Sequence, residues 1–127
     1  MEALMFHSYR DLHAWQKSMC LVKEIYRLTR AFPKEELFGL VQQMRRAAIS
    51  IASNLAEGQG RLTTPEFRRF VGISRGSAME LQTQLLISQD LGYLGGQTQV
   101  FELLDDVCRL VNALQASLKP KLAGRPE

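Results

Sequence analysis

Residues 43–61 read QMRRAAISIASNLAEGQGR, and this stretch decides the fold class. Its apolar side chains recur every three or four positions, at Met44, Ala47, Ala48, Ile51 and Leu55. At about 100° per residue these positions share one face of a helix. The small alanines on that face let a second helix approach closely, and Gly58 and Gly60 suit the end of a helix. The stretch therefore predicts an amphipathic helix inside a close-packed helical protein.

The same helical period continues outward in both directions. It is interrupted at Pro33, between Gly58 and Gly60, between Gly92 and Gly96, and at Pro120. Thr63 and Glu66 have the spacing of a capping box at the third helix start. We predict helices at about 10–31, 36–58, 64–91 and 97–118. Short connections between them predict an all-α fold, an antiparallel up-down-up-down four-helix bundle, with residues 1–127 as a single domain.

Composition and charge set limits on the function. The chain is 46% apolar with a net charge of +3, so nucleic acid is permitted as a partner but not required. The segment from Arg10 to Arg75 contains twelve cations and six acids, whereas the segment from Gly76 to Leu118 contains one cation and five acids. No apolar window of 18 residues occurs, and MEALMFHSYR lacks the pattern of an export signal. We therefore expect a cytoplasmic protein with no membrane contact.

Catalytic and metal-binding patterns do not stand out. His7 and His13 are not part of an E-x-x-H pair, and no GxSxG motif occurs. Cys20 and Cys108 are far apart, which favours buried free thiols over a metal site. We predict that the chain is not an enzyme and has no cofactor and no metal. An aromatic pocket at Trp15 and Tyr26 stays open as an alternative.

A polar network is expected between the second and third helices. Ser74, Ser77, Gln84 and Ser88 lie on the central face of the third helix, where buried polar groups need partners. The predicted network comprises Asn54, Glu57, Arg75, Glu80 and Gln84. Ion pairs of Glu57 with Arg75, or of Glu80 with Arg45, would fix helix register, and the sequence does not choose between them.

Four further apolar residues lie where a monomer should be polar. On the third helix Met79 and Leu86 are seven residues apart and almost opposite Leu81, and Phe38 and Ile49 flank the core face of the second. A second apolar surface of this kind indicates a subunit interface. Scattered surface residues are the alternative explanation. We expect a homo-oligomer that uses these four residues.

A basic stripe is the main candidate for function. Its cations follow a 4-3-4 spacing on one flank of the first helix and continue in the second, at Lys23, Arg27, Arg30, Lys34, Arg45 and Arg46. Such side chains neutralise phosphates without reading bases, so we expect RNA or DNA binding that is salt-dependent and weakly sequence-specific. An ordinary solvated face would show the same stripe.

Four motifs are similar to those of a known family. They are AWQKSM at 14–19, FGL at 38–40, QMRRAAISIASNLAEG at 43–58 and RGSAMELQTQL at 75–85. Together they resemble the proteins encoded in intervening sequences of 23S ribosomal RNA genes, also labelled S23 ribosomal proteins, over about Tyr9 to Leu118. The resemblance implies a four-helix bundle that assembles as a cyclic homopentamer and has no catalytic residues.

A related protein of diversity-generating retroelements binds nucleic acid and a reverse transcriptase. The resemblance therefore adds RNA, DNA, a reverse transcriptase or another protein to the expected partners. The motif positions matched in this sequence are Arg45, Arg46, Asn54, Glu57, Gly58, Arg75, Gly76, Glu80 and Gln84. Three functions stay open: nucleic-acid binding by a basic oligomer, a protein-interaction scaffold without nucleic-acid binding, and an enzyme with an unrecognised pocket.

Overall fold

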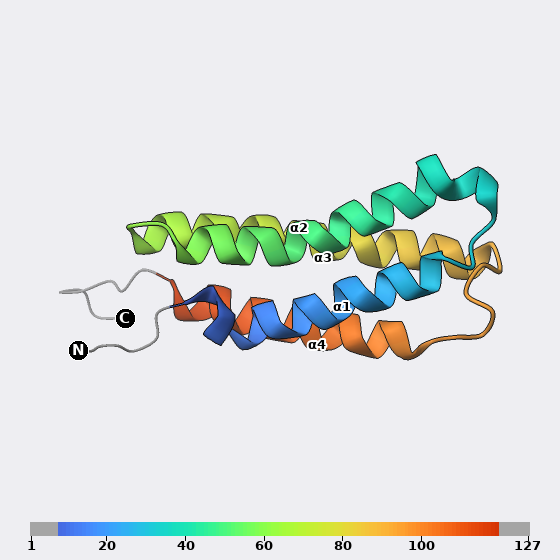
Figure 1. The fold of residues 1–127 in the computed structure, drawn as a ribbon. Coiled ribbons are helices and arrows are strands. Elements are labelled where there is room, and N and C mark those ends of the chain that lie inside the picture. Colours follow the sequence, from blue (N-terminus) through green and yellow to red (C-terminus); the bar gives the residue numbers. More distant parts are fainter. Residues whose placement is uncertain (1–7, 120–127) are drawn as a thin grey trace.

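The structure is a computed structural model that describes residues 8–119. Its main helices are α1 (His13–Thr29), α2 (Gln42–Gln59), α3 (Thr64–Asp90) and α4 (Gln99–Ser117). The chain reverses direction at each connection, so that the helices lie side by side in one elongated bundle (Figure 1). Contacts join α1 to α2, α2 to α3, α3 to α4 and α4 back to α1. The predicted all-α four-helix bundle is confirmed.

All four main helices contribute to one cluster of buried apolar side chains. The largest of its fully buried members are Leu21, Ile25, Met44, Ile51, Leu55, Leu81, Leu85, Leu104, Val107 and Val111. On α2 the small Ala47, Ala48 and Ala52 are buried too, which brings the backbone of α3 close. The apolar positions predicted from the period of residues 43–61 are therefore the ones that face the core.

The 3₁₀ turn before α1 and the helix α3 begin with polar caps, whereas α1 itself has no side-chain cap. Ser8 Oγ accepts a hydrogen bond from Arg10 N at 3.1 Å and starts the 3₁₀ turn Tyr9–Asp11. Leu12 is extended (φ −75°, ψ 122°), so the continuous helix expected from residue 10 begins instead at His13. Thr63 caps α3 as predicted, because its Oγ1 accepts from Glu66 N at 3.3 Å.

The beginning of the second helix differs from the prediction. A 3₁₀ turn, Lys34–Glu36, leads into a π-helical turn, Leu37–Val41, before α2 begins at Gln42. Gly39 interrupts the π turn with φ −112° and ψ −107°. The uninterrupted helix predicted from residue 36 is therefore wrong over its first turn. The apolar period continues through this turn, and periodicity alone does not reveal the break. As a result, the side chain of Phe38 is directed into solvent with 84% of its surface exposed.

Glu36 holds this irregular turn in place. One carboxylate oxygen, Oε1, accepts from Leu40 N at 3.3 Å, and the other, Oε2, accepts from Tyr93 OH at 3.0 Å. The hydrogen bond to Glu36 is the main cause that raises the pKa of Tyr93. Tyr93 also packs against Phe32, with ring centroids 5.3 Å apart. One side chain thus ties the α1–α2 connection to the α3–α4 connection.

We expect Glu36→Ala to lower the free energy of unfolding by about 1–2 kcal/mol, because it removes a cap and a side-chain hydrogen bond together. Urea denaturation measures the change. Glu35→Ala is the matched control, since Glu35 is an exposed neighbour. Equal midpoints for the two variants would show that the Glu36 contacts do not stabilise the turn.

Candidate functional site

Hydrogen bonds join α2 and α3 near the middle of their contact. Ser74 Oγ donates to Ile51 O at 2.8 Å, and Ser50 Oγ lies 2.8 Å from Ser77 Oγ. Asn54 Nδ2 donates to the carbonyl oxygen of Ser50 at 2.9 Å and to its hydroxyl at 3.0 Å. The α2 backbone and Ser50 thus provide hydrogen-bond partners for Ser74 and Ser77 of α3, and Asn54 enters this network through Ser50.

The ion pair predicted between Glu57 and Arg75 is wrong. Glu57 is exposed and pairs with Arg61, one helical turn further on, at 2.9 Å. Arg75 Nε instead donates to Asn112 Oδ1 on α4 at 2.8 Å. Exposed pairs on one helix contribute only tenths of a kcal/mol. Glu57 is therefore a surface residue, and helix register does not depend on it.

The predicted pair of Glu80 with Arg45 is also wrong. Arg45 turns toward α1, where its Nε donates to Thr29 Oγ1 at 2.9 Å and its guanidinium lies 4.4 Å from the ring centroid of Tyr26. Thr29 is buried and donates to Ile25 O at 2.6 Å. Arg45 therefore clamps α1 to α2 by a hydrogen bond and a cation–π contact.

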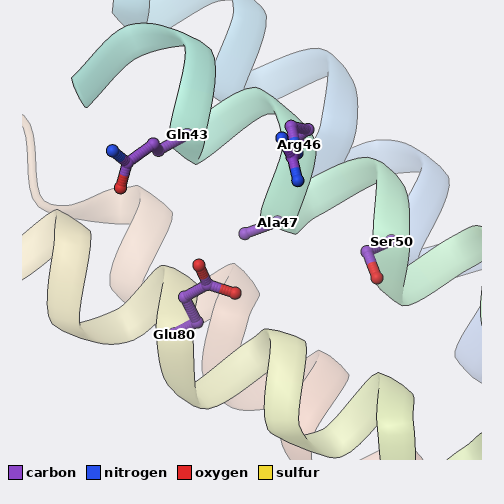
Figure 2. A pocket seen from close by; sticks show the side chains of 5 residues that line it. All are labelled: Gln43, Arg46, Ala47, Ser50 and Glu80. Carbon is purple, nitrogen blue, oxygen red and sulfur yellow. The ribbon is translucent and has the colours of Figure 1, made fainter. Parts of the chain in front are cut away.

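A polar hollow of about 400 Å³ lies between α2 and α3. Gln43, Arg46, Ala47 and Ser50 of α2 border it, together with Glu80 of α3 (Figure 2). The Glu80 carboxylate is directed toward α2 in this view. It accepts only a long hydrogen bond, 3.4 Å from Gln84 Nε2. Within residues 8–119, Arg46 and Glu80 make no ion pair with each other or with a third side chain.

The six predicted cations of the basic stripe differ in their partners. Arg27 is bound to Glu24, with Arg27 Nη2 2.6 Å from Glu24 Oε2, and it also donates to Gln97 Oε1 at 2.7 Å. The hydrogen bond that Glu24 accepts from Arg27 is the main cause that lowers the pKa of Glu24. Arg45 is held against Tyr26 and Arg46 borders the polar hollow. Besides Arg46, three of the six cations are exposed and without an ion pair in the described part of the chain: Lys23, Arg30 and Lys34.

The four predicted interface residues are all exposed. Besides Phe38, the exposed fractions are 41% for Ile49, 42% for Met79 and 47% for Leu86. The sequence analysis missed five similar residues, namely Leu37, Leu62, Ile73, Ile87 and Leu91. Their apolar character was visible in the sequence, but their outward direction depends on the packing of α2 and α3.

Phe38 and Ile49 border an apolar groove between α1 and α2. One end of the groove is a hollow of about 320 Å³, bordered by Tyr26, Leu37, Phe38, Val41, Arg45 and Ile49 among others. The other end, about 290 Å³, is bordered by Tyr9, Trp15, Met19, Val22, Ile49, Ala52 and Ala56 among others. Trp15 and Tyr26 were the candidates for an aromatic pocket. They border different ends of this open groove.

Met79 and Leu86 lie on the far side of the bundle from this groove. Met79 and Leu86 come about one and three helical turns after Arg75, so the three residues share one flank of α3. This flank contacts α4, because Arg75 donates a hydrogen bond to Asn112. Since α1/α2 and α3/α4 are opposite edges of a four-helix bundle with these contacts, the two apolar surfaces face in different directions. One molecule therefore presents two dissimilar apolar surfaces.

The sequence of this bundle matches a known protein family. A model of the 23S rRNA-intervening sequence protein family matches residues 10–116. The chain belongs to this family. The match extends from the turn before α1 almost to the end of α4. No curated protein matches the chain.

The motif positions behind the family resemblance lie on α2 and α3. Gly58 is in contact with α3, since a Cβ there would lie 2.7 Å from Phe70 Cβ. Asn54 belongs to the serine network, whereas Glu80 and Gln84 lie at or beside the polar hollow. Gln84 Oε1 is buried and has no hydrogen-bond partner. Part of the motif thus lies along the α2–α3 contact, whereas Arg45 and Arg75 bind residues of α1 and α4.

The remaining chemical groups are dispersed. Cys20 is exposed, which corrects its prediction as a buried thiol, and burial raises the pKa of the partly buried Cys108. In residues 8–119 no group of three or more His, Cys, Asp or Glu side chains is placed to hold a metal ion. None of the helices in that range has the length and apolar content needed to cross a bilayer. His7 lies outside the described residues.

Proposed function

We propose that this chain is a non-catalytic scaffold that assembles into a homopentameric ring in the cytoplasm and binds RNA or DNA through its basic surface. The observation that carries the proposal is the exposure of Phe38 on a structured turn, opposite a second apolar surface at Met79 and Leu86. An isolated bundle leaves both surfaces in water, and a neighbouring subunit would cover them.

The arrangement of these surfaces favours a ring. Two different surfaces that bind each other make a head-to-tail contact, which closes into a ring when the rotation between subunits is right. The number five comes from the family resemblance. An aromatic anchor such as Phe38 typically contributes more to an interface than its polar surroundings.

The nucleic-acid component rests on Lys23, Arg30 and Lys34. They lie on and just beyond the outer surface of α1 and are not neutralised by a described acid. Three phosphate contacts per subunit are weak, but a ring repeats them, and multivalency raises the avidity for a long strand. This supports backbone binding without base recognition.

A scaffold that binds only protein is the second candidate. It is favoured by the internal engagement of Arg27 and Arg45, which reduces the free basic surface. A reverse transcriptase or another protein would then be the partner. Retention of a protein partner after nuclease treatment, together with no affinity for nucleic acid, would support this candidate.

We expect wild-type protein to bind a labelled single-stranded RNA or DNA of roughly 40 nucleotides in fluorescence anisotropy at about 50 mM salt, and to lose affinity steeply as salt rises. Replacing Lys23, Arg30 and Lys34 with glutamine should weaken binding to all sequences alike and flatten the salt dependence. The matched control replaces Arg61, Arg69 and Arg109, each of which pairs with an acid on its own helix or at its end. Equal losses in both triple variants, or no binding by the wild type, would contradict the proposal.

A further inference from the structure

The polar hollow between α2 and α3 carries two opposite charges that do not cancel each other. Arg46 reaches it from α2 and Glu80 from α3, and no hydrogen bond or ion pair joins the two. Both side chains are exposed, and neither has an ion-pair partner in the described part of the chain, whereas Arg27, for example, is paired with Glu24. An unpaired guanidinium and an unpaired carboxylate that border one hollow can each bind a ligand group.

Two polar groups of this hollow make hydrogen bonds with neighbouring side chains. Gln84, which is 6% exposed, donates a long hydrogen bond of 3.4 Å from Nε2 to Glu80 Oε2. Ser50 is fixed by Ser77 at 2.8 Å and by Asn54 at 3.0 Å. Groups that are already fixed lose less conformational entropy when a ligand binds.

The size of the hollow suits a small ligand. Ala47 lies at its centre and leaves room where a longer side chain would fill the space. The volume of about 400 Å³ is near the lower end of the range for small-molecule sites. Its walls are mainly polar side chains, which disfavours an apolar ligand.

We propose that this hollow binds a small zwitterion of the α-amino acid class. The ligand carboxylate would accept hydrogen bonds from the Arg46 guanidinium of α2, and the ligand ammonium would donate to the Glu80 carboxylate of α3 (Figure 2). A ligand with both charges leaves neither protein charge unpaired, whereas a simple anion or cation satisfies only one of them.

Apart from Arg46, the residues that border the hollow are not those of the surfaces assigned to assembly. The hollow opens between α2 and α3, whereas Ile49 borders the α1/α2 groove and Met79 lies on the other flank of α3. Arg46 also borders the Phe38 end of that groove, so it is the one residue shared by both surfaces. The proposal does not depend on nucleic-acid binding.

NMR titration of the full chain with L-glutamine tests the site. We expect saturable shifts at the amides of Ala47, Ser50 and Glu80, with roughly millimolar affinity because half-exposed ion pairs contribute little. N-acetyl-glutamine lacks the ammonium and glutamine methyl ester lacks the carboxylate, so each should bind at least about tenfold more weakly. Arg46→Gln and Glu80→Gln should each abolish saturation, while Arg61→Gln should leave it unchanged.

The two site variants change exposed residues, so their spectra should keep the dispersion of the folded protein. Absence of shifts up to about 20 mM glutamine would overturn the proposal. Equal binding of both derivatives, or binding that survives in Arg46→Gln and Glu80→Gln, would overturn it as well. Binding by a monomeric Phe38 variant would support the zwitterion site even if the ring proposal failed.

Discussion

Replacing Phe38 with glutamate is expected to convert the assembly into monomers. The side chain is exposed in the single chain, so its removal should not unfold the bundle. In the ring it would be a buried aromatic anchor, and truncating such an anchor typically costs 2 kcal/mol or more of binding free energy, to which burial of a charge adds. Multi-angle light scattering should show the mass fall to that of one 14.4 kDa chain.

Leu62→Glu is the matched control for this substitution. Leu62 is fully exposed at the α2–α3 turn and lies on neither of the two apolar surfaces. The same charge at Leu62 should therefore leave the oligomer intact. A Phe38→Glu variant with the wild-type mass would show that the π turn does not take part in assembly. Loss of assembly in both variants would indicate a general effect of added negative charge.

Gly58→Ala is expected to destabilise the bundle by about 1–3 kcal/mol, because overpacking a close helix contact forces the backbone to shift. A Cβ at this position would lie 2.7 Å from Phe70 Cβ, 3.1 Å from Phe67 Cδ1 and 3.2 Å from the carbonyl oxygen of Phe67. Two of these atoms are backbone or next to it and cannot rotate away. Thermal and urea denaturation should both show the loss.

Gly76→Ala supplies the opposite result on the neighbouring helix. Gly76 lies inside α3, and a Cβ there would meet no atom within 4 Å. Removing a glycine from a helix interior should raise stability by about 0.5–1 kcal/mol, since alanine loses less backbone entropy on folding. Equal stability of the two alanine variants would contradict the close α2–α3 contact at Gly58.

The sequence predicted the regular parts of the fold well because local rules decide them. The third helix was expected at 64–91 and is found at Thr64–Asp90, since the Thr63 cap fixes its start. The fourth was expected at 97–118 and is found at Gln99–Ser117. The apolar face of residues 43–61 is buried as its period requires.

The irregular and long-range features could not be predicted in the same way. The π turn preserves the apolar spacing, and its Glu36 contacts include Tyr93, 57 residues further along the chain. Arg45 donates a hydrogen bond to Thr29 and Arg75 to Asn112, and these pairings depend on how the helices are rotated against each other. A stripe of cations in sequence likewise does not reveal that Arg27 is already paired. Helical periodicity sets which face is buried but not which polar groups meet.

The mass of the wild-type protein in solution tests the central proposal most directly. Native mass spectrometry, with light scattering over a wide concentration range, should give a closed assembly of five chains, about 72 kDa from a chain of 14.4 kDa. On dilution the mass should stay at that of five chains, down to the concentration at which the ring dissociates. A 14.4 kDa monomer at every concentration would contradict a ring built from the two apolar surfaces.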